Sequence, residues 1–134
     1  MNDLELIKGI INEEFVDTEL YRREAELFEK KVIDGQRISF IFRKFSADEN
    51  AHILILKKLY KLNNYTIPHR KIIEYKKIRN VLRMHLIRET SSIKLYKKML
   101  TNASGLKEKR YIEAILDSEK NNLITIKKYL FFLK

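Results

Sequence analysis

The sequence predicts an all-α protein built from four amphipathic helices, and three features support this. Apolar residues recur at alternating steps of three and four through most of the 134 residues, which is the spacing that keeps one face of a helix toward its neighbours. Helix breakers are sparse, with three Gly and one Pro. Hydrophobic residues make up 45% of the chain, which is enough for one sizeable core. We therefore expect a single domain spanning residues 1–134.

The first two helices are expected over residues 3–33 and 36–62. In each helix, the residues at this spacing form a line along one face, called here the apolar stripe. The apolar stripe of the first helix contains Ile7, Ile11, Glu14, Thr18, Tyr21, Ala25 and Phe28. The stripe of the second contains Ile38, Phe42, Phe45, Glu49, His52, Leu56 and Leu59. Gly35, which follows Asp34, is expected to end the first helix as a C′ glycine.

The last two helices are expected over residues 77–101 and 107–133, with Gly105 between them. The stripe of the third contains Ile78, Leu82, His85, Glu89, Ile93, Tyr96 and Leu100. The stripe of the fourth contains Ile112, Ile115, Glu119, Asn122, Ile126 and Leu133. The connection that precedes this pair, residues 63–77, contains Pro68 and is the only long irregular stretch.

This connection is long enough to run the length of the helices. If the second and third helices are parallel, it must descend about 39 Å, at ~1.5 Å per helical residue. Residues 63–77 can span about 50 Å when extended. The sequence therefore predicts a lengthwise crossover between parallel second and third helices, not a tight antiparallel hairpin.

One glutamate interrupts each apolar stripe near its midpoint: Glu14, Glu49, Glu89 and Glu119. Glu49 also opens a Glu-x-x-His with His52. An unpaired carboxylate inside a helical core costs several kcal/mol, so four of them require compensation. A bound pair of dications would compensate, because carboxylates and imidazole facing inward from four helices are the ligands of di-iron or di-manganese bundles.

The two halves of the chain repeat this arrangement. Tyr21 follows Glu14 by seven residues, and Tyr96 follows Glu89 by seven. Glu49 to His52 and Glu119 to Asn122 occupy equivalent places in the second and fourth helices. A repeated hairpin supplies two half-sites related by a pseudo-twofold axis, which suits a metal pair.

Composition excludes several other classes. Without Cys, the chain has no disulfide framework, Cys-ligated zinc site or iron–sulfur cluster. It also lacks a G-x-S-x-G, a phosphate-cradling Gly loop and a dinucleotide fingerprint. The acidic N-terminus is unlike a signal peptide, and no apolar run approaches the ~18 residues that span a bilayer. A cytoplasmic location is expected.

The net charge of +10 leaves two interpretations open. A basic surface for polyanions is one, and solvated outer helix faces are the other. The second is favoured because most basic doublets fall opposite the stripes, so a nucleic-acid partner is an alternative that is not preferred. Residues 129–133, which are apolar on all sides, indicate a subunit interface and hence a homodimer or higher homo-oligomer.

In their order and spacing, four segments resemble the ferritin-like superfamily, nearest to the rubrerythrin-type di-iron domains. These segments are E-E-F-V-D-T-E-L-Y, D-E-N-A-H, R-E-T-S-S-I-K-L-Y and D-S-E-K-N-N, and the resemblance covers nearly the whole chain. It implies a ferritin-like four-helix bundle that holds two iron ions, with manganese as an alternative. The residues it implicates as ligands are Glu14, Glu49 with His52, Glu89 and Glu119, with Tyr21 and Tyr96 close to the metals.

The chain departs from this family at Asn122, where the pattern has His. Asn is a poor ligand for iron, although its amide oxygen binds hard cations. His85 lies one turn before Glu89, and in an antiparallel pair of helices it would reach the level of Asn122. We expect either that His85 supplies the missing imidazole, or that it is a hydrogen-bonded core histidine or points outward.

The resulting hypothesis is a metal protein that oxidises bound Fe(II) with peroxide or dioxygen, in peroxide scavenging or iron handling. Lacking a rubredoxin-like partner domain, the chain would need an external electron donor to turn over. Two alternatives are a non-enzymatic helical scaffold on a degenerate ferritin-like fold and a basic nucleic-acid-binding adaptor.

Overall fold

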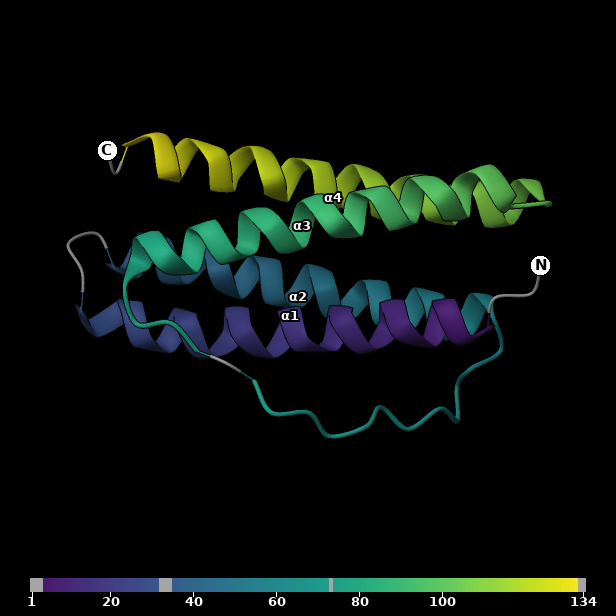
Figure 1. The fold of residues 1–134 in the computed structure, drawn as a ribbon, viewed down its shortest axis with the longest axis horizontal. Helices are drawn as coiled ribbons and strands as arrows, with labels where there is room; N and C mark the ends of the chain where they lie inside the picture. The colour runs from purple at the N-terminus through teal and green to yellow at the C-terminus, as the bar shows by residue number, and fades with distance from the viewer. Residues whose placement is uncertain (1–3, 32–34, 73, 133–134) are drawn as a thin grey trace. The chain divides into compact units, whose positions relative to one another are not determined.

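A computed structural model describes residues 4–31, 35–72 and 74–132. These residues form four α-helices and no strand: α1 (Leu4–Lys31), α2 (Gly35–Leu59), α3 (Ile78–Asn102) and α4 (Leu106–Phe132) (Figure 1). The all-α prediction is thereby confirmed, with helix ends within a few residues of those expected. Three of the predicted helix ends, at residues 3, 33 and 133, lie outside the described residues, as do Asp34 and the stripe residue Leu133. The chain divides into two compact units, Met1–Glu74 and Tyr75–Lys134.

In the first unit, α1 and α2 form an antiparallel pair, called here the first hairpin (Figure 1). Four aromatic rings pack between these helices. The ring of Tyr21 lies 5.5 Å from that of Phe42 and 5.2 Å from that of Phe45, centroid to centroid. Phe28 lies 6.3 Å from Phe42. The tilted and edge-on geometries are those that aromatic rings prefer, so the predicted apolar stripes meet as expected here.

Gly35 has a different role from the one the sequence predicted. It is the buried first residue of α2, and no glycine among the described residues has a positive φ, so it is not a left-handed cap of α1. A Cβ at this position would overlap the carbonyl oxygen of Phe28 and come within 3.0 Å of that of Glu29. The turn brings the two backbones too close for any side chain, and this closeness explains the glycine.

The left-handed residue that caps a helix is instead Lys61, with φ of 57°, just beyond α2. The amide of Leu62 donates to the carbonyl of Lys57 at 2.7 Å, and the amide of Lys61 donates to that of Lys58 at 3.4 Å. This pair of bonds is the Schellman arrangement, which satisfies carbonyls at the end of a helix. The chain therefore turns out of α2 sharply and begins its return.

The irregular segment after α2 runs back along α1 (Figure 1). Tyr65 donates its hydroxyl to Asn12 at 2.8 Å, and the guanidinium of Arg70 bonds to Glu13. Further along, Glu74 accepts from Arg23 at 2.9 Å. The partners on α1 advance from residue 12 to residue 23 as the segment advances, so it crosses lengthwise, as predicted for residues 63–77.

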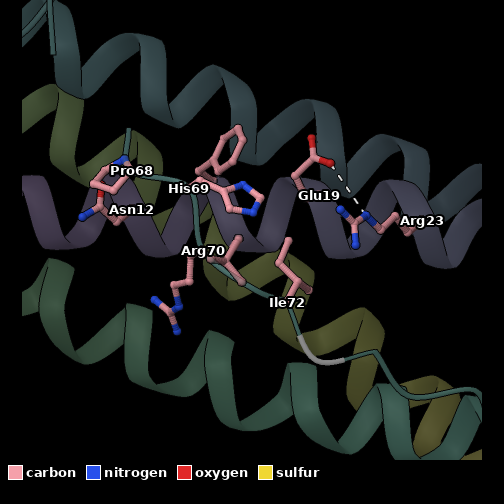
Figure 2. Close-up of a pocket in the computed structure, with 9 residues that line it drawn as sticks. Asn12, Glu19, Arg23, Pro68, His69, Arg70 and Ile72 are labelled. Atoms are coloured by element: carbon pink, nitrogen blue, oxygen red, sulfur yellow. Dashed lines mark ion pairs between the residues drawn. The ribbon is translucent and has the colours of Figure 1, made fainter. Parts of the chain in front are cut away.

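Between this segment and α1 lies a pocket of about 390 Å³ (Figure 2). Its α1 wall includes Asn12, Val16, Glu19 and Arg23, and residues 68–70 and 72 form the other wall. His69 is exposed in this segment. The α1 residues of this wall repeat every three or four positions, so they share one helix face, opposite the face that bears Glu14.

In the second unit, α3 and α4 pack together as the second hairpin. The predicted break at Gly105 is present, and the carbonyl of this residue accepts from the amide of Lys109 at 3.0 Å. Glu108 turns back to accept from the amide of Ser104 at 3.1 Å, an interaction that satisfies a donor at the start of α4.

None of the described helices is both long and apolar enough to cross a membrane. The apolar end of α4 is partly in solvent, with Phe131 65% and Phe132 78% exposed. Their rings pack edge-on at 5.7 Å. The subunit interface expected at this end stays a prediction.

Candidate metal centre

The first hairpin brings together three of the side chains that the sequence predicted as ligands. Glu14 projects from α1, and Glu49 and His52 project from α2, three residues apart on one helix face. All three are buried, with exposed fractions of 1%, 0% and 4%. Nδ1 of His52 lies 3.3 Å from Oε2 of Glu14 and 3.9 Å from Oε1 of Glu49.

These separations suit three ligands of one cation. Each residue offers one ligand atom, and the three atoms lie within 4.8 Å of one another. Ligands about 2.1 Å from a metal stand roughly 3.0–3.4 Å apart at octahedral or tetrahedral angles. The 3.3 Å between His52 and Glu14 falls in this range and exceeds the ~2.7–2.9 Å of a strong charged hydrogen bond.

Hydroxyl groups tie α1 to α2 at the same level. The hydroxyl of Thr18 donates to the carbonyl oxygen of Glu14 at 2.9 Å. The hydroxyl of Ser46 donates across the helix pair to the carbonyl oxygen of Thr18 at 2.8 Å. Of these two contacts, the one from Ser46 joins α1 to α2, one turn from Glu14.

Sequence reasoning missed two buried carboxylates on α1. Asp17 is 1% and Glu24 is 2% exposed, and an oxygen of Asp17 lies within 4.8 Å of one of Glu49. Steps of three and four also connect Glu14 to Asp17, Tyr21 and Glu24. A second stripe at that spacing was present in the sequence and could have identified both.

Glu13, adjacent to Glu14, lies off the apolar stripe and is partly exposed. Its side chain is 38% exposed and forms an ion pair with Arg70. Two neighbouring glutamates of one helix thus face different environments, which gives the site an internal control.

The second hairpin buries the remaining predicted ligands. Glu89 and His85 on α3 and Glu119 on α4 are 0% exposed, and Asn122 on α4 is 2% exposed. The Nδ2 atom of Asn122 has no hydrogen-bond partner among the described residues. A buried amide nitrogen without an acceptor is unfavourable, so Asn122 is not accounted for by ordinary core packing.

His85 is held in its neutral form. Burial, with a smaller contribution from the nearby Arg88 guanidinium, lowers the pKa of His85 to about 3. A neutral imidazole keeps a lone pair, which a metal ligand requires. This state fits two of the expectations for His85, ligand and core histidine, and the burial of its side chain excludes the third, an outward position.

Tyr21 and Tyr96 are fully buried, each with 0% exposure. Tyr21 lies one turn beyond Asp17 on α1, where its ring also joins the aromatic cluster with Phe42 and Phe45. Their proposed place next to a metal stays a prediction.

Apart from the hydroxyls of Tyr21 and Tyr96, the buried ionisable side chains of the described residues are all carboxyls or imidazoles. No lysine or arginine is among them; the members are Glu14, Asp17, Glu24, Glu49, His52, His85, Glu89 and Glu119. Carboxylate oxygen and imidazole nitrogen are the donors that iron, manganese and zinc accept. Buried acidic and histidine residues compatible with a di-iron site are therefore present in a four-helix protein.

The chain was also compared with known proteins. No protein-family model matches it, and no curated protein matches it at a significant level.

Proposed function

We propose that this chain is a carboxylate- and histidine-ligated metal protein of the ferritin-like kind that oxidises Fe(II) with dioxygen or peroxide. Glu14, Glu49 and His52 would hold one metal ion. Glu89 and Glu119 would contribute to a second, with His85 or Asn122 completing its ligands. A pair of iron or manganese ions in such a site supplies one-electron chemistry toward dioxygen and peroxide.

The observation that carries this proposal is the position of Nδ1 of His52 between carboxylates of two helices. A histidine that simply fills a core needs one hydrogen-bond partner for this atom. Two carboxylates from separate helices around one ring nitrogen, all nearly inaccessible to water, form a donor set for a cation.

The chain's own residues would contribute three things to the chemistry. Glu14 and Glu49 bring negative charge that favours the more oxidised metal. His52 orients the ligands, because its place on α2 is fixed by the helix. The low exposure of these groups keeps bulk water away, so their electrostatic effect is strong. Asp17, beside Glu49, is placed to hold or release a proton as the charge of the site changes.

Asn122 supports an asymmetric pair. An amide oxygen is a weaker donor to iron than an imidazole, so the metal near the second hairpin would be held less tightly and would exchange sooner. This behaviour is consistent with Fe(II) that enters and leaves as a substrate beside a more firmly bound ion.

The test compares the neighbouring glutamates of α1. Wild type, Glu14→Gln and Glu13→Gln would be prepared metal-free, loaded anaerobically with Fe(II) or Mn(II), desalted and measured by elemental analysis. The wild type and Glu13→Gln should retain up to two ions per chain, and Glu14→Gln at least one fewer. Air or peroxide added to the Fe(II) forms should then produce ferric absorption in the wild type and in Glu13→Gln.

Retention of the same metal content by Glu14→Gln would overturn the site assignment. A wild type that binds neither metal would overturn the proposal and favour the non-enzymatic scaffold. Metal retention without oxidation would keep the site and discard the chemistry.

A further inference from the structure

The excess of positive over negative charge in this protein belongs to one of its two units. The segment Met1–Glu74 contains 13 Lys and Arg and 13 Asp and Glu, so it is formally neutral. The segment Tyr75–Lys134 contains 15 basic and 5 acidic residues. The whole net charge of +10 therefore belongs to the unit that contains α3 and α4.

Helix α3 carries the clearest share of this excess. It has six basic residues and a single acidic one, Glu89, which is fully buried. Its solvent side has no carboxylate at all. By contrast, the exposed side of α4 includes Glu113 and Asp117, which dilute its lysines.

The exposed basic residues of α3 share one side of the helix. We call them the cationic face of α3: Arg79, Arg83, Lys94, Lys97 and Lys98. A helix turns by about 100° per residue, so positions 79, 83, 94 and 97 lie within an arc of about 60° around the helix axis. Position 98 lies about 40° beyond the edge of this arc. The face extends about 28 Å along the helix.

Most of these charges have no ion-pair partner in the part of the chain that the structure describes. Arg83, Lys94, Lys97 and Lys98 form no ion pair with any other described residue. Three arginines of the first hairpin behave differently, since Arg22, Arg23 and Arg43 each pair with a glutamate. A row of uncompensated cations repels itself and is stabilised by an external polyanion.

We propose that the cationic face of α3 binds the phosphate backbone of double-helical nucleic acid without reading its sequence. A duplex carries one negative charge per about 1.7 Å of axis, and a straight row of cations about 28 Å long spans most of a duplex turn of about 34 Å. This function is separate from the metal chemistry and does not depend on it.

The composition of the face favours a duplex over other polyanions. The only large apolar residue exposed on α3 is Ile87, among described residues, whereas a helix that lies in a membrane surface needs an apolar face. The same side offers no exposed aromatic ring, on which the bases of single strands would stack. An acidic protein partner would require an apolar centre of contact that this face lacks.

The experiment uses two triple variants of the full chain with equal change in charge. Arg83→Gln/Lys94→Gln/Lys97→Gln alters the cationic face, and Arg37→Gln/Lys58→Gln/Lys71→Gln alters exposed residues of the neutral unit. The probe is a labelled mixed-sequence duplex DNA of about 30 base pairs, roughly three turns. Binding is followed by fluorescence anisotropy from about 50 to 200 mM salt.

The wild type should bind the duplex with affinity that falls steeply as salt rises. The triple variant of the cationic face should bind the duplex at least tenfold more weakly than the wild type. Each lost phosphate contact reduces the steepness of log K against log salt concentration by roughly 0.9, so three lost contacts should reduce it by about 2–3. The control triple should stay within about twofold of wild type. Melting curves establish that both variants are folded.

Three results would overturn the proposal. One is a wild type that does not bind the duplex. A second is equal weakening by both triples, which would indicate net charge alone. The third is tighter binding to a single strand of the same length, or to vesicles rich in anionic lipid, than to the duplex.

Discussion

Nδ1 of His52 lies 3.3 Å from Oε2 of Glu14, a carboxylate 38 residues earlier in the chain. The contact joins the middle of α1 to the middle of α2 in a region that excludes water. It makes His52 the residue through which the behaviour of the first half of the site can be tested most directly.

Removal of both α2 ligands should abolish metal binding at the first half-site. In Glu49→Ala/His52→Ala, Glu14 would keep at most one neighbouring carboxylate as a co-ligand, too few donors to hold a transition metal tightly. Elemental analysis after anaerobic loading with Mn(II) should show at least one ion fewer per chain. Asn50→Ala, an exposed change on the same helix, is the control. Wild-type metal content in the double variant would show that the ligands lie elsewhere.

Metal should stabilise the folded protein in a concentration-dependent way. A ligand that binds only the folded state adds about 2.7 kcal/mol at 100 times its Kd, which for a domain of this size raises Tm by roughly 10 °C. Thermal unfolding of chelated protein at pH 7, repeated with increasing Mn(II), measures this. A Tm indifferent to metal would leave the buried carboxylates without the proposed cation.

His85 should make the metal-free protein sensitive to acid. Its pKa is about 3 in the folded state and about 6.5 in the unfolded state, so between these values the unfolded chain binds more protons. The contribution of neutral His85 to the free energy of unfolding is fully present above pH 6.5. It is lost as pH is lowered toward 3, at up to about 1.4 kcal/mol per pH unit.

The comparison that isolates this effect is His85→Gln against wild type, by urea unfolding of chelated protein from pH 7.5 to pH 4. Protonation of the buried carboxylates acts in both proteins, so the difference between the two profiles reports on His85. His85→Gln should flatten the acid loss, whereas His69→Gln, at an exposed position, should leave it unchanged. Identical profiles for His85→Gln and wild type would contradict the assignment.

The two helical glycines should respond to alanine in opposite directions. Gly9→Ala should stabilise by about 0.5–1 kcal/mol, because the position is in a helix and a Cβ there meets nothing within 4 Å. Gly35→Ala should destabilise by about 1–3 kcal/mol through overlap with the Phe28 carbonyl. Equilibrium urea unfolding measures both, and stabilisation by Gly35→Ala would contradict the close approach of α1 and α2.

Lys61→Gly should stabilise the end of α2. Lys61 has a positive φ, which costs a residue with a Cβ roughly 1 kcal/mol relative to glycine. The control Lys58→Gly, within the last turn of α2, should destabilise by about 1 kcal/mol. A loss of stability in Lys61→Gly would show that the lysine side chain matters more than its backbone conformation.

The helices could be predicted because their signal is local and redundant. In α2, seven stripe residues repeat at steps of three and four, and Gly105 with its polar neighbours marks the break before α4. Glu14 and Glu49 were identifiable as buried because each interrupts an otherwise apolar stripe. The lengthwise path of residues 63–77 was predicted because the segment is long enough to run the length of the helices if the second and third are parallel, and its contacts with α1 agree with such a path.

Asp17, Glu24 and Gly35 were not predicted correctly because their environments are set by packing. A single stripe assumes one buried line along a helix, but α1 buries a broader face, which includes Asp17 and Glu24. Gly35 is required by the backbone of Glu29 and Phe28, a contact across the turn that local sequence does not encode. Both errors come from three-dimensional neighbours, not from propensity.

The first hairpin has a consequence for how the protein is made. Its two helices are consecutive in the sequence, and helical structures built from neighbouring elements have lower contact order and fold faster than structures with long-range strand pairing. Glu14, Glu49 and His52 are all synthesised before α3, and chains commonly fold from the N-terminus as they emerge. The three side chains can thus be gathered while translation is still under way, so the nascent chain would be able to capture its first metal ion before the second hairpin is complete.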